Sequence, residues 1–241
     1  MPKQKVVKGG PHRGSPRGVQ HTVSRFWASD RGLGVFLWLL VGTLFVFKPL
    51  EDFDVLPGVL LGVMFALVAM SGVLAMTSSS RLKATFLAFA VVGIVFSYIR
   101  HTRPGTTIVL ASLAVDLTWL GIVCGVVMQQ VFRTGPITWH RIEGAIVVYV
   151  VFGVMCADVF RTMHTLDPMA FNLNGQPLAP TTHESVFNYF SFTTLTTVGY
   201  GDIAPANPLA RAMANFEALA GQVYLATLIS RLVSMGRAER S

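Results

Sequence analysis

This chain of 241 residues contains one stretch that decides its fold, Thr197-Val198-Gly199-Tyr200-Gly201-Asp202. Successive carbonyls can face one axis if the backbone alternates between ordinary and left-handed dihedrals, and glycine at 199 and 201 allows this without a Cβ clash. The Thr197 hydroxyl adds an inner ring of oxygens. The oxygens of four such strands around one axis would take the place of the water molecules that a potassium ion loses on entering. Because the chain holds one copy, the stretch predicts a homotetramer.

The longer segment 187–202, FNYFSFTTLTTVGYGD, resembles the pore helix and selectivity filter of the potassium-channel superfamily. The resemblance implies that potassium ions bind at residues 197–201 and that Asp202 lies at the outer mouth. It also implies an aromatic cuff around the filter, formed by Tyr189 and Phe190. Thr193 stands where some members place an acid that bonds the mouth aspartate, and we assign it to filter support. The alternative is a glycine-rich turn between two apolar helices.

The composition indicates a membrane protein. Hydrophobic side chains make up 52% of the chain and charged ones only 13%, which is too apolar for a soluble domain of this size. The formal net charge is +7, but the cations gather at the ends of apolar segments, which argues against a nucleic-acid surface. Cys124 and Cys156 lie inside apolar runs, so we expect neither a disulfide framework nor a metal site.

The apolar pattern predicts an all-α integral membrane protein with six transmembrane helices. A crossing needs roughly 20 apolar residues, and the candidate segments are 32–49, 56–76, 82–99, 106–132, 142–162 and 208–234. A shorter apolar stretch, 184–196, predicts a re-entrant pore helix between the fifth and sixth spans. Filter backbone that is not helical is tolerated at membrane depth only where protein surrounds it and water or ions pass it.

These segments divide the chain into four parts. We expect a basic disordered tail over 1–31, a four-helix membrane domain over 32–133, a pore domain over 140–234 and a short tail over 235–241. The basic tail and first apolar run could imitate a signal peptide. However, Lys48-Pro49-Leu50-Glu51 follows that run, rather than a cleavage site of small residues.

The basic residues predict the orientation. With both termini cytoplasmic, fourteen of the nineteen Lys and Arg residues lie on the inner side of the plasma (inner) membrane, as expected for membrane proteins. Only the loop at 100–103, which carries two arginines on the predicted outer side, argues against this orientation. The basic tail could lie against anionic lipids, or it could be a solvated topology signal.

Segment 106–131 argues against steep voltage sensing, because it has no Lys or Arg. A mobile charge extracts about 2.3 kcal/mol per 100 mV from the field, and this segment has no cation to do so. Its only ionisable residue is Asp116, which we expect to face the helix bundle near Ser112 and Thr118. Asp116 could be a hydrogen-bonded packing residue, a cation or proton site, or the partner of an arginine.

The last span offers two candidate gating features. Gly221 follows Gly201 by twenty residues, and the family resemblance implies a hinge there. The alternative role is close packing beside small residues. Leu225, Ile229 and Val233 recur every four residues and so share one face. That face could form an apolar inner gate, or it could pack on the fifth helix.

The leading hypothesis is a passive, potassium-selective channel with no enzyme activity and no cofactor other than potassium ions in the filter. A potassium transporter subunit is the second hypothesis, although such relatives usually carry four degenerate filters in one chain. A non-conducting sensory or assembly protein is the third. His164 and His183 have no partner at ligand spacing, so we expect solvated residues of the outer loop.

Overall fold

The structure is a computed structural model that describes residues 32–48, 50, 105–131, 139–180 and 182–238, together with 84, 87–89, 91–93, 95, 96 and 99. The expected tail 1–31, the expected span 56–76, eight residues of the span 82–99 and the residues after 238 lie outside the described residues.

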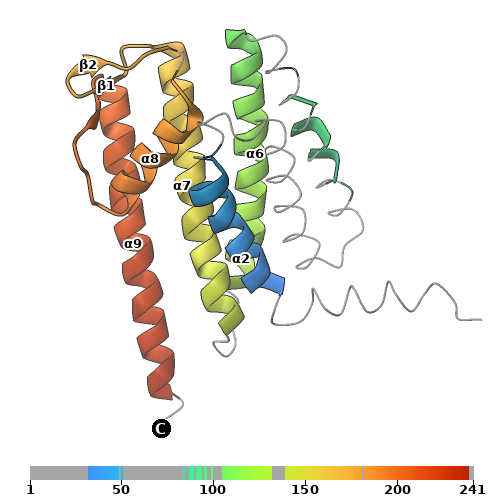
Figure 1. The fold of residues 1–241 in the computed structure, drawn as a ribbon. Coiled ribbons are helices and arrows are strands. Elements are labelled where there is room, and N and C mark those ends of the chain that lie inside the picture. The colour runs from blue at the N-terminus through green and yellow to red at the C-terminus, as the bar shows by residue number, and fades with distance from the viewer. Residues whose placement is uncertain are drawn as a thin grey trace, which may run out of the picture.

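The described part of the chain is mostly helical (Figure 1). Its helices are α2 (Gly32–Gly42), which continues as the π-helical turn η1 (Thr43–Phe47), then α6 (Thr106–Val131), α7 (Trp139–Leu166), α8 (Glu184–Leu195) and α9 (Pro208–Ala238). The sequence placed these helices at 32–49, 106–132, 142–162, 184–196 and 208–234, within a few residues of the observed bounds. Two stretches of them, Thr106–Gln129 and Arg141–Leu166, are long and apolar enough to cross a membrane.

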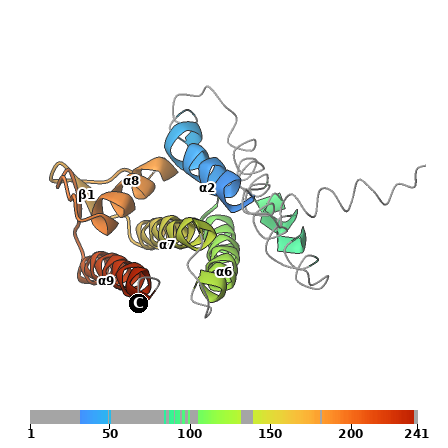
Figure 2. The ribbon, with the colours of Figure 1, turned by 90° about the horizontal axis from the view of Figure 1, so that it is seen from below.

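Helix α7 lies at the centre of the molecule. Seen from below, α6 lies on one side of it and α9 on the other, while α2 and α8 pack along its remaining faces (Figure 2). Helix α8 is short and bridges α7 and α9 near one end of the bundle. The pore helix expected from the sequence therefore sits between the two helices that flank it in the chain.

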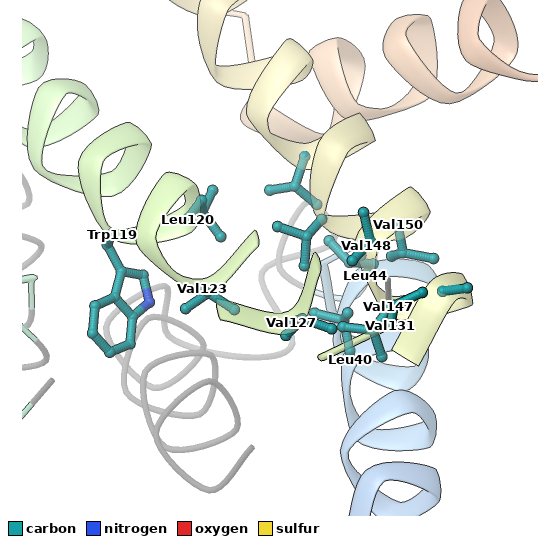
Figure 3. Close-up of a cluster of buried hydrophobic side chains, with 13 residues drawn as sticks. Leu40, Leu44, Trp119, Leu120, Val123, Val127, Val131, Val147, Val148 and Val150 are labelled. Atoms are coloured by element: carbon teal, nitrogen blue, oxygen red, sulfur yellow. The ribbon is translucent and has the colours of Figure 1, made fainter. Parts of the chain in front are cut away.

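A cluster of buried aliphatic side chains joins α2, α6 and α7 (Figure 3). Leu40 and Leu44 meet valines of α6 and α7 there, among them Val127 and Val147. On α6 the buried residues recur every three or four positions, which is the spacing of one helix face. Leu120, Val123, Val127 and Val131 form this series, and Leu113 lies on the same face about two turns before Leu120.

The segments between α7 and α8 and between α8 and α9 form a small antiparallel sheet, so the expectation of a purely α-helical fold is wrong at this place. Its strands are β1 (Phe171–Leu173), β2 (Gln176–Pro177) and β3 (Ile203–Pro205), in the order β2-β1-β3. Asn174 and Gly175 join β1 to β2 with φ of 50° and 80°, as a tight hairpin requires. Strands of two or three residues have too few positions to display an alternating pattern, so the sequence did not reveal them.

The sheet covers an aromatic cluster of four phenylalanines, with ring centroids 4.9–5.9 Å apart where they touch. They are Phe160, Phe171, Phe187 and Phe190. His164 packs on the same cluster, 5.4 Å from Phe187, and its Nε2 lies 3.0 Å from the Ala179 carbonyl. The expectation that His164 is a solvated loop residue is therefore wrong, because α7 continues through it and the phenylalanines bury it. His183 is exposed, as expected.

Candidate functional site

The stretch after α8 has the alternating backbone that its glycines allow. Helix α8 ends at Leu195, and Thr197, Gly199 and Gly201 then have φ of 60°, 52° and 80°. Every second residue is therefore left-handed. Thr197 was not expected to take this conformation, which costs a residue with a Cβ about 1–2 kcal/mol.

Hydrogen bonds from α8 hold this strained backbone in place. The Thr197 amide donates to the Thr194 carbonyl at 2.9 Å, and the Gly199 amide donates to the Thr193 carbonyl at 3.1 Å. The Thr193 hydroxyl is occupied elsewhere, since it donates to the Phe190 carbonyl at 2.9 Å. Thr193 thus supports the stretch through its backbone and not through its side chain.

Tyr189 contacts the carboxyl-terminal end of the stretch 197–202. Its hydroxyl donates to Asp202 Oδ2 at 2.9 Å, and its ring stacks on Tyr200 with centroids 6.2 Å apart and planes 3° from parallel. The Asn174 amide of the β1–β2 hairpin also donates to the Asp202 carbonyl, at 2.7 Å. Phe190 lies in the buried phenylalanine cluster instead. The two residues of the expected aromatic cuff therefore have different surroundings.

Glycines bring α7 and α9 against the carboxyl end of α8. A Cβ built on Gly221 of α9 would lie 2.7 Å from Leu195 Cδ1 and 2.8 Å from the Leu195 carbonyl oxygen. A Cβ on Gly153 of α7 would lie 2.9 Å from Phe192. The Tyr149 hydroxyl of α7 donates to that same Leu195 carbonyl at 3.2 Å, and so pairs one of the carbonyls left open at a helix end. Gly221 is thus a close-packing residue in this structure.

Helix α9 uses one face for these contacts and leaves another open. The inward face runs through Ala210, Ala214, Glu217, Gly221, Tyr224 and Leu228, at helical spacing. Ile229 and Val233 lie off that face and are 59% and 53% exposed in the single chain. In the single chain these two residues do not pack on α7. Leu225, the third member of the stripe, is half-buried.

Charged residues meet at the amino end of α8. Glu184 pairs with Lys48 Nζ at 3.5 Å and also with Arg161 of α7. Asp158 of α7 lies within electrostatic range of all three and of Asp116 on α6. Sequence reasoning treated these cations only as markers of topology, because nothing in the sequence signals a contact between positions 48, 161 and 184.

Asp116 is half-buried and faces α7, as expected of an acid within the bundle. The hydroxyl hydrogens of its two polar neighbours are donated elsewhere. The Ser112 hydroxyl donates to the Val109 carbonyl at 2.8 Å, and the Thr118 hydroxyl donates to the Ala114 carbonyl at 2.7 Å. Arg81 and Arg100, two arginines from the ends of neighbouring segments that could pair with it, lie outside the described residues.

Glu217 is a further buried acid, not expected from the sequence, and it bonds Ser191 of α8. A signal was present, because Glu217 is the only acid within the last apolar segment, 208–234. An ionisable residue inside such a segment needs a polar partner.

Comparison with known families gives one match. A family model described as ion channel matches residues 145–238, which cover most of α7, all of α8, the stretch 197–202 and α9. No curated protein and no solved structure matches the chain.

Proposed function

We propose that the chain forms a homotetrameric, potassium-selective channel, and the match of residues 145–238 to the ion channel family model supports this proposal. In this proposal four copies of residues 197–201 surround the axis of the tetramer, and potassium ions pass along that axis in single file. The channel moves ions passively, and the chain carries out no enzymatic reaction.

The observation that carries the proposal is the left-handed backbone at Thr197, Gly199 and Gly201. Alternating dihedrals in a T-V-G-Y-G sequence are what rings of carbonyl ligands require. The stretch follows the carboxyl end of α8, where the negative end of a helix dipole favours a cation. Val198 and Tyr200 are 54% and 72% exposed in the single chain, so their surfaces are available to neighbouring copies.

The open face of α9 supports an assembly of several copies. Large apolar side chains are exposed along it, including Phe216, Leu219 and Val223. Exposed apolar surface on this scale marks an interaction surface with protein or lipid. In the proposed tetramer, part of this face lines the inner pore and part packs on the neighbouring subunit.

We propose a six-span topology with both termini in the cytoplasm. Asp202, the small sheet and the Lys48–Glu184 pair then share the outer end of the bundle. Arg231 lies at the inner end, where its guanidinium donates to the Val131 carbonyl at 3.2 Å. Cations near inner helix ends agree with the usual distribution of basic residues. The basic tail is then positioned to meet anionic lipids.

The test is ion selectivity of the purified full chain in planar bilayers. We expect unitary currents whose reversal potential follows the potassium gradient and not the sodium gradient. Gly199→Ala should abolish or derange selective conduction, because it places a Cβ at φ of 52°. Gly175→Ala is the matched control, since Gly175 is also left-handed, at 80°, but lies in the β1–β2 turn.

Two results would contradict this function. Equal permeability to sodium and potassium in the unsubstituted protein would show that residues 197–201 do not form a potassium-selective filter. Potassium flux without unitary currents would favour the transporter hypothesis, whereas complete absence of flux in a correctly assembled protein would favour a non-conducting role.

A further inference from the structure

Glu217 is a buried acid that the proposed conduction pathway does not use. It lies on α9 one turn before Gly221 and has no exposed surface. None of the described lysines, arginines or histidines pairs with it. Its Oε2 has no hydrogen-bond partner in the described structure. An ionised carboxylate in such surroundings would be costly, so burial favours the neutral acid.

The hydrogen bonds around Ser191 give an independent reason for the same conclusion. Ser191 Oγ lies 2.7 Å from the Gly153 carbonyl oxygen and 2.5 Å from Glu217 Oε1. A serine hydroxyl has one hydrogen to donate, and a backbone carbonyl can only accept. Both contacts can be hydrogen bonds only if Ser191 donates to Gly153 and Glu217 donates to Ser191. That donation requires a proton on Glu217.

Among the described titratable groups that face Glu217, only the Cys156 thiol is within hydrogen-bond reach of its carboxyl. Cys156 and Tyr149 face it from α7. The Tyr149 hydroxyl is already donated to Leu195, and a thiol is only a weak donor. On α9 itself the nearest ionisable residues are Arg211, which is exposed, and Tyr224, whose hydroxyl donates to the Ala145 carbonyl.

We propose that Glu217 is protonated in the conducting channel and acts as a positioning residue for the filter, an inference that rests on the proposed function. The proton completes a relay from Glu217 on α9 through Ser191 on α8 to Gly153 on α7. Ser191 lies one helical turn before Leu195, where α8 ends and the filter begins. The relay fixes α8 against both neighbouring helices and so fixes the start of the filter.

Loss of the proton has two effects that act in the same direction. Without the proton, the Glu217 carboxylate and the Gly153 carbonyl compete to accept the one hydrogen of Ser191. A negative charge also appears in a site that lacks a cation. Both effects favour separation of α9 from α8. Alkaline conditions should therefore close the channel or derange its filter, while neutral and acidic conditions keep the relay intact.

The first experiment records the open probability of the purified full chain in bilayers over a neutral-to-alkaline pH series. We expect at least about a tenfold fall in the unsubstituted protein at the alkaline end, equivalent to about 1.4 kcal/mol. Glu217→Gln should conduct normally at neutral pH and lose this fall, because its amide donates to Ser191 and has no proton to release. Ser191→Ala should conduct poorly at every pH. A Glu217→Gln variant that is inactive at neutral pH, or that keeps the alkaline fall, would overturn the proposal.

The second experiment detects the proton without relying on conduction. Infrared spectra of the assembled protein at neutral pH should contain a protonated carboxyl stretch that Glu217→Gln removes. Asp167→Asn is the control, because both oxygens of Asp167 accept hydrogen bonds, from the Met169 amide and from Asn207, so neither oxygen has to donate one. A spectrum unchanged by Glu217→Gln would overturn the proposal. If the band disappears but the protein passes no potassium, the protonation of Glu217 stands and the proposed function fails.

Discussion

The two halves of the described molecule are held together by different kinds of contact. On the α2–α6 side of α7, interlocking leucine and valine side chains form the interface. On the α8–α9 side, glycines bring the backbones together and hydroxyls bond carbonyls across helices. Glycine contacts and polar bonds tolerate few substitutions, whereas aliphatic packing accepts many combinations of similar volume. The family match over 145–238 falls on the half with the restrictive contacts.

The largest effect expected from this difference is at Gly221. Gly221→Ala places a methyl group 2.8 Å from the Leu195 backbone oxygen, which cannot move without shifting the end of α8. We expect a loss of stability of about 1–3 kcal/mol and loss of most of the selective current. Size-exclusion chromatography and bilayer recording measure the two effects.

Gly125→Ala is the matched substitution in the other half. Gly125 lies in α6, and a Cβ there would meet nothing within 4 Å. Alanine should be neutral or stabilise the helix by up to about 1 kcal/mol. Equal damage from the two substitutions would show that the proposed difference between the halves does not exist.

The second prediction concerns the open face of α9. In the proposed tetramer, Leu225, Ile229 and Val233 form an apolar constriction at the inner mouth, and a polar side chain would wet it. Ile229→Asn should raise the basal open probability. Val223→Asn is the control, because Val223 is similarly exposed, at 57%, but lies beside Phe216 and Leu219, about a third of a turn around α9 from Ile229. If neither substitution changes single-channel opening while filter variants do, the gate lies at the filter.

A smaller effect is expected at the ion pairs that join the two halves. Glu184→Gln leaves Lys48 of the first helix and Arg161 of α7 without their shared carboxylate. The Glu184 side chain is 28% exposed, so we expect a cost of about 1 kcal/mol, which salt partly screens. Thermal unfolding at low and high salt measures it, and a double-mutant cycle with Lys48→Gln isolates the pair. A coupling energy of zero would mean that the charges do not join the halves.

Features that depend on neighbouring residues were predictable from the sequence. Long apolar segments located α6, α7 and α9, and the glycines at 199 and 201 indicated the left-handed backbone. Features that depend on distant residues were not. The relay joins positions 153, 191 and 217, and the tight contact of Gly221 is with Leu195. Only folding brings these positions together, and no periodicity in the chain records that they meet.

The smallest expected effect is the response to voltage, and it tests whether the α2–α6 side does more than pack. Helix α6 spans Thr106–Val131 and contains no Lys or Arg, so it has no cation to move through the field. Its one acid, Asp116, faces α7 and lies within electrostatic range of Asp158. We expect open probability to change only weakly over a physiological voltage series, with a slope well below that of several gating charges per subunit. Asp116→Asn should leave the slope unchanged, because the residue sits in a packed interface. A steep activation curve that Asp116→Asn flattens would instead assign voltage sensing to α6.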